Sequence, residues 1–106
     1  MGNYTPFADL MVVPPGGRMF LVDVKGQSTK NFWRIKAKEE RSNLFYVLCY
    51  VGDPSSNRFF PLSQAKLHEL MDRYRTSGIK YDERFAGFNW GDALGYENGW
   101  DQLPLT

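Results

Sequence analysis

The sequence predicts an α+β fold: a mixed, mostly antiparallel sheet of about four strands, one main helix, and an irregular aromatic C-terminal tail. Three observations lead to this prediction. Short β-prone runs separated by turn residues fill much of the first 60 positions, one amphipathic helical pattern follows, and the last twenty residues are rich in glycine and aromatic side chains. The length of 106 residues supports one hydrophobic core, so we expect a single domain over residues 1–106.

The first two strands are predicted to form a β-hairpin. Residues 8–13 and 19–25 are β-prone, and the proline- and glycine-rich residues between them have turn chemistry. If the hairpin folds symmetrically about Gly16, Asp9 lies directly opposite Asp23, with their Cβ atoms about 5 Å apart. The hairpin thus predicts two neighbouring carboxylates at one end of the sheet.

Two more strands and the main helix follow. The unbroken apolar run at residues 44–51 predicts a central strand buried on both faces, and residues 58–60 predict a short further strand. Residues 63–77 predict the helix, because Ser63 can cap its start and apolar side chains follow at helical spacing. These apolar positions are Leu67, Leu70, Met71 and Tyr74. We expect Gly78 to end the helix and His68 to face solvent.

The C-terminal segment is predicted to contain turns and one short helix at residues 90–96. Its aromatic side chains are expected to cover the core, and they are Phe85, Phe88, Trp90 and Trp100. A surface on which bases stack is the alternative interpretation of these aromatic residues.

Composition and the N-terminus exclude several classes of protein. One histidine and one cysteine exclude a self-contained structural zinc site, and no apolar run approaches the roughly 18 residues of a membrane span. The first residues resemble no secretory signal, so we expect a reduced, cytoplasmic protein without a membrane segment.

Positive charge is concentrated in one stretch although the formal net charge is only +1. Residues 25–41 contain six basic and two acidic residues, a local charge of +4 that could follow a phosphate backbone. The candidate nucleic-acid-binding residues are Lys30, Arg34, Lys36 and Lys38. A solvated loop is the alternative.

The hairpin also carries the residues with the most informative chemistry. Side chains alternate along a strand, so Asp23 and Lys25 project from the same face, beside Asp9. Two opposed carboxylates destabilise a sheet, whereas a divalent cation between them makes the arrangement favourable. Lys25 could then orient a water molecule or stabilise charge on a phosphate. Alternatively, Lys25 forms an ordinary salt bridge, and a one-residue change of register would separate Asp9 from Asp23.

Asp9, the turn, and the segment Asp23–Val24–Lys25–Gly26 resemble the signature of the PD-(D/E)XK nuclease-like superfamily, which includes restriction endonucleases and small bacterial nuclease-like proteins. The resemblance implies a restriction-endonuclease-like core, a Mg²⁺ or Mn²⁺ cofactor and a nucleic-acid substrate. It implies metal ligation by Asp9, Asp23 and the Val24 carbonyl, with Lys25 as the catalytic lysine.

One departure from this family leaves three functions open. Its members usually begin with a helix that packs on the sheet, but only eight residues precede Asp9. We therefore expect either the C-terminal tail or a second copy of the chain, in a homodimer, to cover that face. The functions are a Mg²⁺-dependent nuclease, a catalytically inactive nuclease-fold binding protein, and a small α+β binding protein with an ordinary Asp–Lys salt bridge.

Overall fold

The computed structural model describes residues 8–52, 56–77 and 86–105. Within these ranges the main sheet has four strands in the spatial order β1–β2–β4–β5. Their bounds are Leu10–Val12 for β1, Phe20–Gln27 for β2, Leu44–Tyr50 for β4 and Arg58–Ser63 for β5. The β1–β2 and β4–β5 pairs are antiparallel and the β2–β4 pair is parallel, so the predicted mixed, mostly antiparallel sheet is confirmed.

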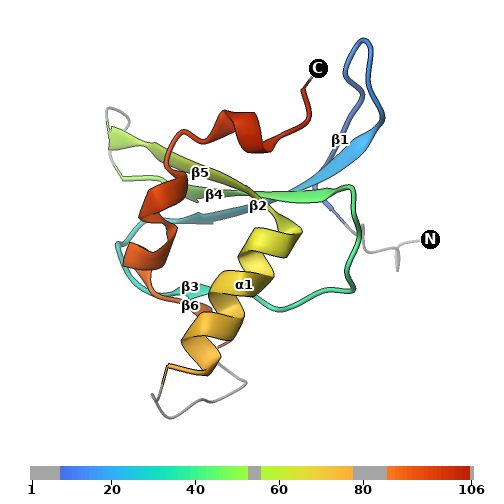
Figure 1. The fold of residues 1–106 in the computed structure, drawn as a ribbon. Coiled ribbons are helices and arrows are strands. Elements are labelled where there is room, and N and C mark those ends of the chain that lie inside the picture. The colour runs from blue at the N-terminus through green and yellow to red at the C-terminus, as the bar shows by residue number, and fades with distance from the viewer. Residues whose placement is uncertain (1–7, 53–55, 78–85, 106) are drawn as a thin grey trace, which may run out of the picture.

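The remaining elements lie around this sheet (Figure 1). The main helix is α1 (Gln64–Arg75), and a small second sheet joins β3 (Trp33–Arg34) to β6 (Gly87–Phe88). The 3₁₀ helices are η3 (Trp90–Tyr96) and η4 (Trp100–Gln102). In Figure 1, α1 and the β3–β6 pair lie below the main sheet, and η4 with the C-terminal segment lies above it.

The larger hydrophobic core lies between the main sheet and the layer formed by α1, β3, β6 and η3. Inward-facing side chains of β4 and β5 meet the apolar stripe of α1 and a stacked pair of indoles, Trp33 and Trp90, whose ring centroids are 5.6 Å apart. The buried members of this core are Trp33, Ile35, Leu44, Tyr46, Leu48, Phe60, Leu62, Leu67, Leu70, Phe88 and Ala93. The predictions that 44–51 is a central strand and that Phe88 and Trp90 cover the core are confirmed.

A smaller core covers the other face of the sheet. Phe20, Val22, Val47 and Cys49 are buried there, and Leu103 from the C-terminal segment packs against them. Trp100 lies 6.0 Å from Phe59, although Trp100 itself is partly exposed. The C-terminal segment thus covers part of this face, which is one of the two expected ways of covering it. The other way, a second copy of the chain in a homodimer, stays a prediction.

The main helix is close to its predicted limits. The Ser63 hydroxyl accepts a hydrogen bond from Lys66 N–H at 3.2 Å, so the predicted N-cap is confirmed. The helix ends at the C-cap Thr76, before Gly78, which lies outside the described residues. No helix in the described ranges is long and apolar enough to cross a membrane.

Two local predictions require correction. Strand β5 continues beyond residue 60 through Pro61 to Ser63, because β5 is an edge strand where a proline without an N–H is tolerated. His68 does not face solvent freely: its side chain is only 18% exposed, and its Nδ1 lies 3.5 Å from Glu40 Oε1. The cause is the chain between β3 and β4, which passes beside α1.

Gly87 permits the close pairing of β3 with β6. It has a φ of +144°, and a Cβ at this position would lie 1.8 Å from the Trp33 carbonyl oxygen. We expect Gly87→Ala to lower the free energy of unfolding by about 2 kcal/mol or more, since backbone must move to relieve the clash. Urea denaturation measures this change.

Gly91→Ala is the matched control, because a Cβ at Gly91 meets open space. Its free energy of unfolding should stay within about 0.5 kcal/mol of the parent value. Equal effects of the two substitutions would contradict the role given to Gly87.

Candidate functional site

The hairpin has the register that the sequence predicts. Met11 pairs with Leu21 and Leu10 pairs with Val22, which is the alignment that results from symmetry about Gly16. The Asp9 N–H donates a 3.0 Å hydrogen bond to the carbonyl of Val22, the residue that pairs with Leu10, so the regular pairing of β1 with β2 ends at Leu10. The ladder therefore does not contain the predicted Asp9–Asp23 pair, although the two side chains lie close enough to interact.

Asp9 is an exposed carboxylate whose charge is stabilised by the neighbouring strand. Its Oδ2 accepts a 2.8 Å hydrogen bond from the Val24 N–H. This bond is the main reason that the pKa of Asp9 lies below its usual value of 3.8; the Asp23 side chain, Lys25 and Lys38 lower the pKa further, while partial burial opposes them. Asp9 is therefore ionised at neutral pH.

Asp23 is buried and paired with two lysines. The residue is 3% exposed, and its Oδ2 lies 2.8 Å from Lys38 Nζ and 3.7 Å from Lys25 Nζ. The Lys25 and Lys38 side chains are 39% and 28% exposed, so the ammonium groups lie between this carboxylate and solvent. The two ammonium groups offset the repulsion that two adjacent carboxylates would otherwise have.

Tyr46 lies beneath this cluster in the core. It pairs with Asp23 across the β2–β4 ladder, and burial, followed by the charge of Asp23, raises its pKa to about 12 although Gln64 acts in the opposite direction. The phenol is therefore protonated at neutral pH. Its hydroxyl lies beside Gln64 but forms no well-aligned hydrogen bond with any residue in the described ranges.

Gln64, the first residue of α1, anchors the chain that carries Lys38. The Gln64 side chain is buried; its Nε2 donates to the carbonyls of Lys38 (3.4 Å) and Glu39 (3.1 Å), and its Oε1 accepts from the Arg41 N–H at 2.7 Å. The described residues 35–43, here called the connecting segment, form neither helix nor strand. Their path across the site therefore depends on these side-chain contacts.

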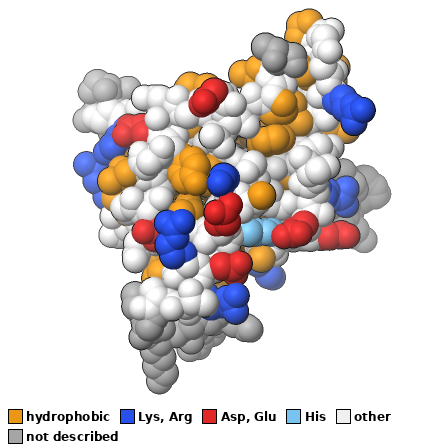
Figure 2. All heavy atoms as spheres, in the orientation of Figure 1, with side chains coloured by type: hydrophobic (Ala, Val, Ile, Leu, Met, Phe, Trp, Pro, Cys, Tyr) orange, Lys and Arg blue, Asp and Glu red, His pale blue; other side chains and the backbone are white. Residues whose placement is uncertain are grey.

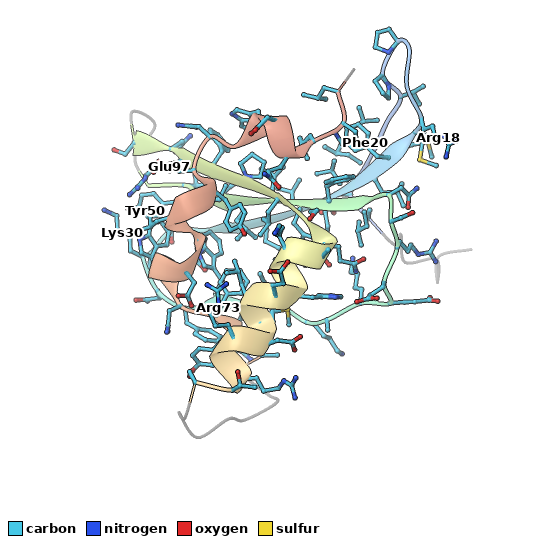
Figure 3. The ribbon with its side chains drawn as sticks, viewed as in Figure 1. Arg18, Phe20, Lys30, Tyr50, Arg73 and Glu97 are labelled. Carbon is cyan, nitrogen blue, oxygen red and sulfur yellow. The ribbon has the colours of Figure 1, made fainter. Side chains whose placement is uncertain are left out.

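The four predicted nucleic-acid contacts do not lie in one place. Lys38 belongs to the carboxylate cluster, Lys36 is exposed on the connecting segment, and Arg34 lies in β3. Lys30 lies 5.7 Å above the ring of Tyr50, with Glu97 also at that end of the sheet, whereas Phe20 lies at the other (Figure 3). Tyr50, the ring under Lys30, pairs with Gln27, which lies four residues after Asp23 along β2. Lys30 and Asp23 are therefore separated by about 13 Å along the strand.

The oxygen atoms at this site fit a hard divalent cation. The Val24 N–H contacts Asp9 at Oδ2, and the ammonium groups of Lys38 and Lys25 contact Asp23 at Oδ2. The Val24 N–H is directed to the β1 side, so its carbonyl is directed to the same edge of β2. Two carboxylates and a carbonyl, completed by water, are typical ligands of Mg²⁺. No group of three or more His, Cys, Asp or Glu side chains comes together within the described ranges.

Three features of the site were not predicted: Lys38 on Asp23, Gln64 under the connecting segment, and Tyr46 beside both. One signal was present in the sequence, because Gln64 precedes Leu67 by three residues and so lies on the apolar stripe of the helix. A polar residue on such a stripe indicates a buried hydrogen-bonding role. The other contacts depend on the parallel β2–β4 pairing and on an irregular segment, which residue patterns do not specify.

Comparisons with protein-family models, curated proteins and solved structures give no match to this chain.

The buried Tyr46 hydroxyl allows a test of the packing under Asp23. We expect Tyr46→Phe to leave the free energy of unfolding unchanged or to raise it by up to about 1 kcal/mol, because the substitution removes a buried hydroxyl that forms no well-aligned hydrogen bond with the described residues. Urea denaturation of the variant and the parent measures the difference. A loss above about 1 kcal/mol would show that the hydroxyl is hydrogen-bonded.

The low pKa of Asp9 predicts a pH-dependent contribution to stability. A carboxyl whose pKa is lower in the folded chain stabilises the fold above its unfolded pKa, and this contribution is lost as the pH falls through the folded value. We expect Asp9→Ala to melt below the parent at pH 7, and the difference to shrink as the pH falls below 3.8.

Asp9→Asn provides the matched control, because it keeps an oxygen acceptor for the Val24 N–H but does not titrate. The difference in melting temperature between Asp9→Asn and Asp9→Ala should therefore stay constant with pH. If the parent and Asp9→Ala differ equally at pH 7 and pH 2.5, the interpretation of Asp9 is wrong.

Proposed function

We propose that this protein is a Mg²⁺- or Mn²⁺-dependent phosphodiesterase that acts on nucleic acid. The observation that carries the proposal is the proximity of Asp9, Asp23 and Lys25: the Lys25 ammonium lies 3.7 Å from Asp23, and the Asp9 side chain interacts with both residues. When bound, a divalent cation at such a site lowers the pKa of a water molecule and polarises a phosphoryl oxygen.

The side chains have complementary roles in this proposal. Asp9 and Asp23, with the Val24 carbonyl, hold the cation. The Lys25 ammonium, 3.7 Å from Asp23 and partly exposed, stabilises the negative charge that develops on the phosphate. Lys36, exposed on the connecting segment, and Lys30, beyond the end of β2, contact neighbouring phosphates along the strand.

The order of elements supports a restriction-endonuclease-like core. The hairpin of β1 and β2 is followed by the long central strand β4, the edge strand β5 and the helix α1, and this is the order that the resemblance implies. Asp23 lies within β2 and Asp9 directly precedes β1, so the sheet fixes the position of one carboxylate and supports the other, which suits a site that requires fixed geometry. The cytoplasmic location stays a prediction.

A second candidate is a nuclease-fold protein that binds nucleic acid without cleaving it. The observation that favours it is the ion pair between Lys38 and Asp23, because the four charged side chains of the site already sum to zero. A neutral cluster is stable without a metal ion. The two candidates differ in whether the protein hydrolyses its ligand.

Cleavage assays distinguish the two candidates. Labelled single-stranded, duplex and branched DNA and RNA oligonucleotides are incubated with the parent protein and MgCl₂ or MnCl₂. We expect cation-dependent cleavage, reduced at least about a hundredfold by Asp23→Asn and by Lys25→Met, the size of effect seen when a charge-stabilising group is removed from an active site.

Lys66→Met is the control variant for Lys25→Met, because Lys66 is exposed on α1, pairs with Glu69, and its substitution lowers the net charge by the same single charge. Its cleavage rate should match that of the parent. Binding without cleavage by the parent would select the second candidate, and cleavage retained by both site variants would exclude the proposed site.

A further inference from the structure

Lys38 occupies the position on Asp23 that a cation would be expected to take. Its Nζ lies 2.8 Å from Asp23 Oδ2, nearly 1 Å closer than the Nζ of Lys25. Because Asp23 is 3% exposed, its charge requires compensation by nearby positive groups. Lys38 provides the closer of the two ammonium groups.

The fold itself places Lys38 at this position. Ile35 is buried in the larger core at the start of the connecting segment, and the buried Gln64 side chain binds the carbonyls of Lys38 and Glu39 and the Arg41 N–H. The backbone from Lys38 to Arg41 is therefore held against the first turn of α1, and the buried Ile35 fixes the segment before Lys38. In Figure 2, acidic side chains lie on both sides of the pale-blue histidine, and basic side chains lie near them.

We propose that Lys38 is an internal counter-ion that competes with a divalent cation for Asp23 and so determines the cation affinity of the site. This inference rests on the proposed function, since it concerns the same carboxylates. A cation that binds Asp9 and Asp23 must share Asp23 with Lys38 or displace its ammonium group. The four side chains together with the cation then carry a charge of +2, which attracts a phosphodiester.

Calorimetric titration with MnCl₂ tests this role without measuring cleavage. We expect Lys38→Met to bind Mn²⁺ more tightly than the parent by a factor of about ten or more. This is the smallest change in affinity that follows from the coupling energies measured for close charge pairs. Lys38→Arg keeps the positive charge and should bind Mn²⁺ as the parent does. Lys66→Met makes the same change of net charge away from the site, and its affinity should also match that of the parent.

The melting temperature provides a second measurement on the same variants. Without metal, Lys38→Met should melt below Lys66→Met, because the buried Asp23 loses its nearer counter-ion. MnCl₂ should then raise the melting temperature of Lys38→Met by more than it raises that of the parent, since tighter binding stabilises the folded state further.

The outcomes separate this inference from the proposed function. If the parent binds Mn²⁺ and Lys38→Met binds it no more tightly than Lys66→Met, the role of Lys38 is wrong and the metal site stands. If neither the parent nor any variant binds Mn²⁺, both are wrong.

Should Lys38→Met not fold, acylation of the parent by a lysine-reactive ester, followed by mass spectrometry, tests the same step. Mn²⁺ should speed the labelling of Lys38 but not that of Lys66. An unchanged rate at Lys38 would overturn the inference.

Discussion

The near-complete burial of one acidic side chain, Asp23, is the constraint on which the arrangement of the site depends. An acidic group is tolerated in a protein interior only when positive or hydrogen-bonding groups surround it. Here the compensation comes from three parts of the chain: the strand of Asp23 supplies Lys25, the connecting segment supplies Lys38, and α1 supplies the Gln64 side chain that holds that segment. One charge thus links the sheet, an irregular segment and the main helix.

The same constraint explains how two acidic residues can be neighbours in this hairpin. In a hairpin built for stability alone, neighbouring acidic residues would be unfavourable. The Val24 N–H, bound to Asp9 at 2.8 Å, and the two lysines make the pair compatible with folding in the absence of metal. Under the proposed function, the chain folds with its candidate ligands in place, and a cation would bind to carboxylates that are already oriented.

Local patterns predicted the fold well where neighbouring residues determine structure. The hairpin register follows from alternation and a symmetric turn, and the helix follows from the Ser63 cap and apolar spacing. The β3–β6 pair was not predicted, because each strand is two residues long and the pairing depends on contact between segments more than fifty residues apart. The continuation of β5 through Pro61 was missed for a related reason, since only the sheet order shows that β5 is an edge strand.

The candidate site divides in the same way. Asp9, Asp23 and Lys25 could be placed together from one strand pair, whereas Lys38 was interpreted as part of a basic surface and lies in the carboxylate cluster instead. Lys38 lies fifteen positions after Asp23, and its side chain reaches Asp23 because the chain between them returns to β2, a path that no periodic pattern describes. Charge counting identified the right segment but not the partner of each charge.

The Gln64 contacts have a consequence for the dynamics of the molecule. The Arg41 amide proton has its acceptor on a side chain that begins the helix, so fraying of the first helical turn would release that proton together with the backbone that positions Lys38. Local opening of the two segments is thereby coupled, and hydrogen exchange at Arg41 should occur in the same cooperative unit as exchange in the first turns of α1.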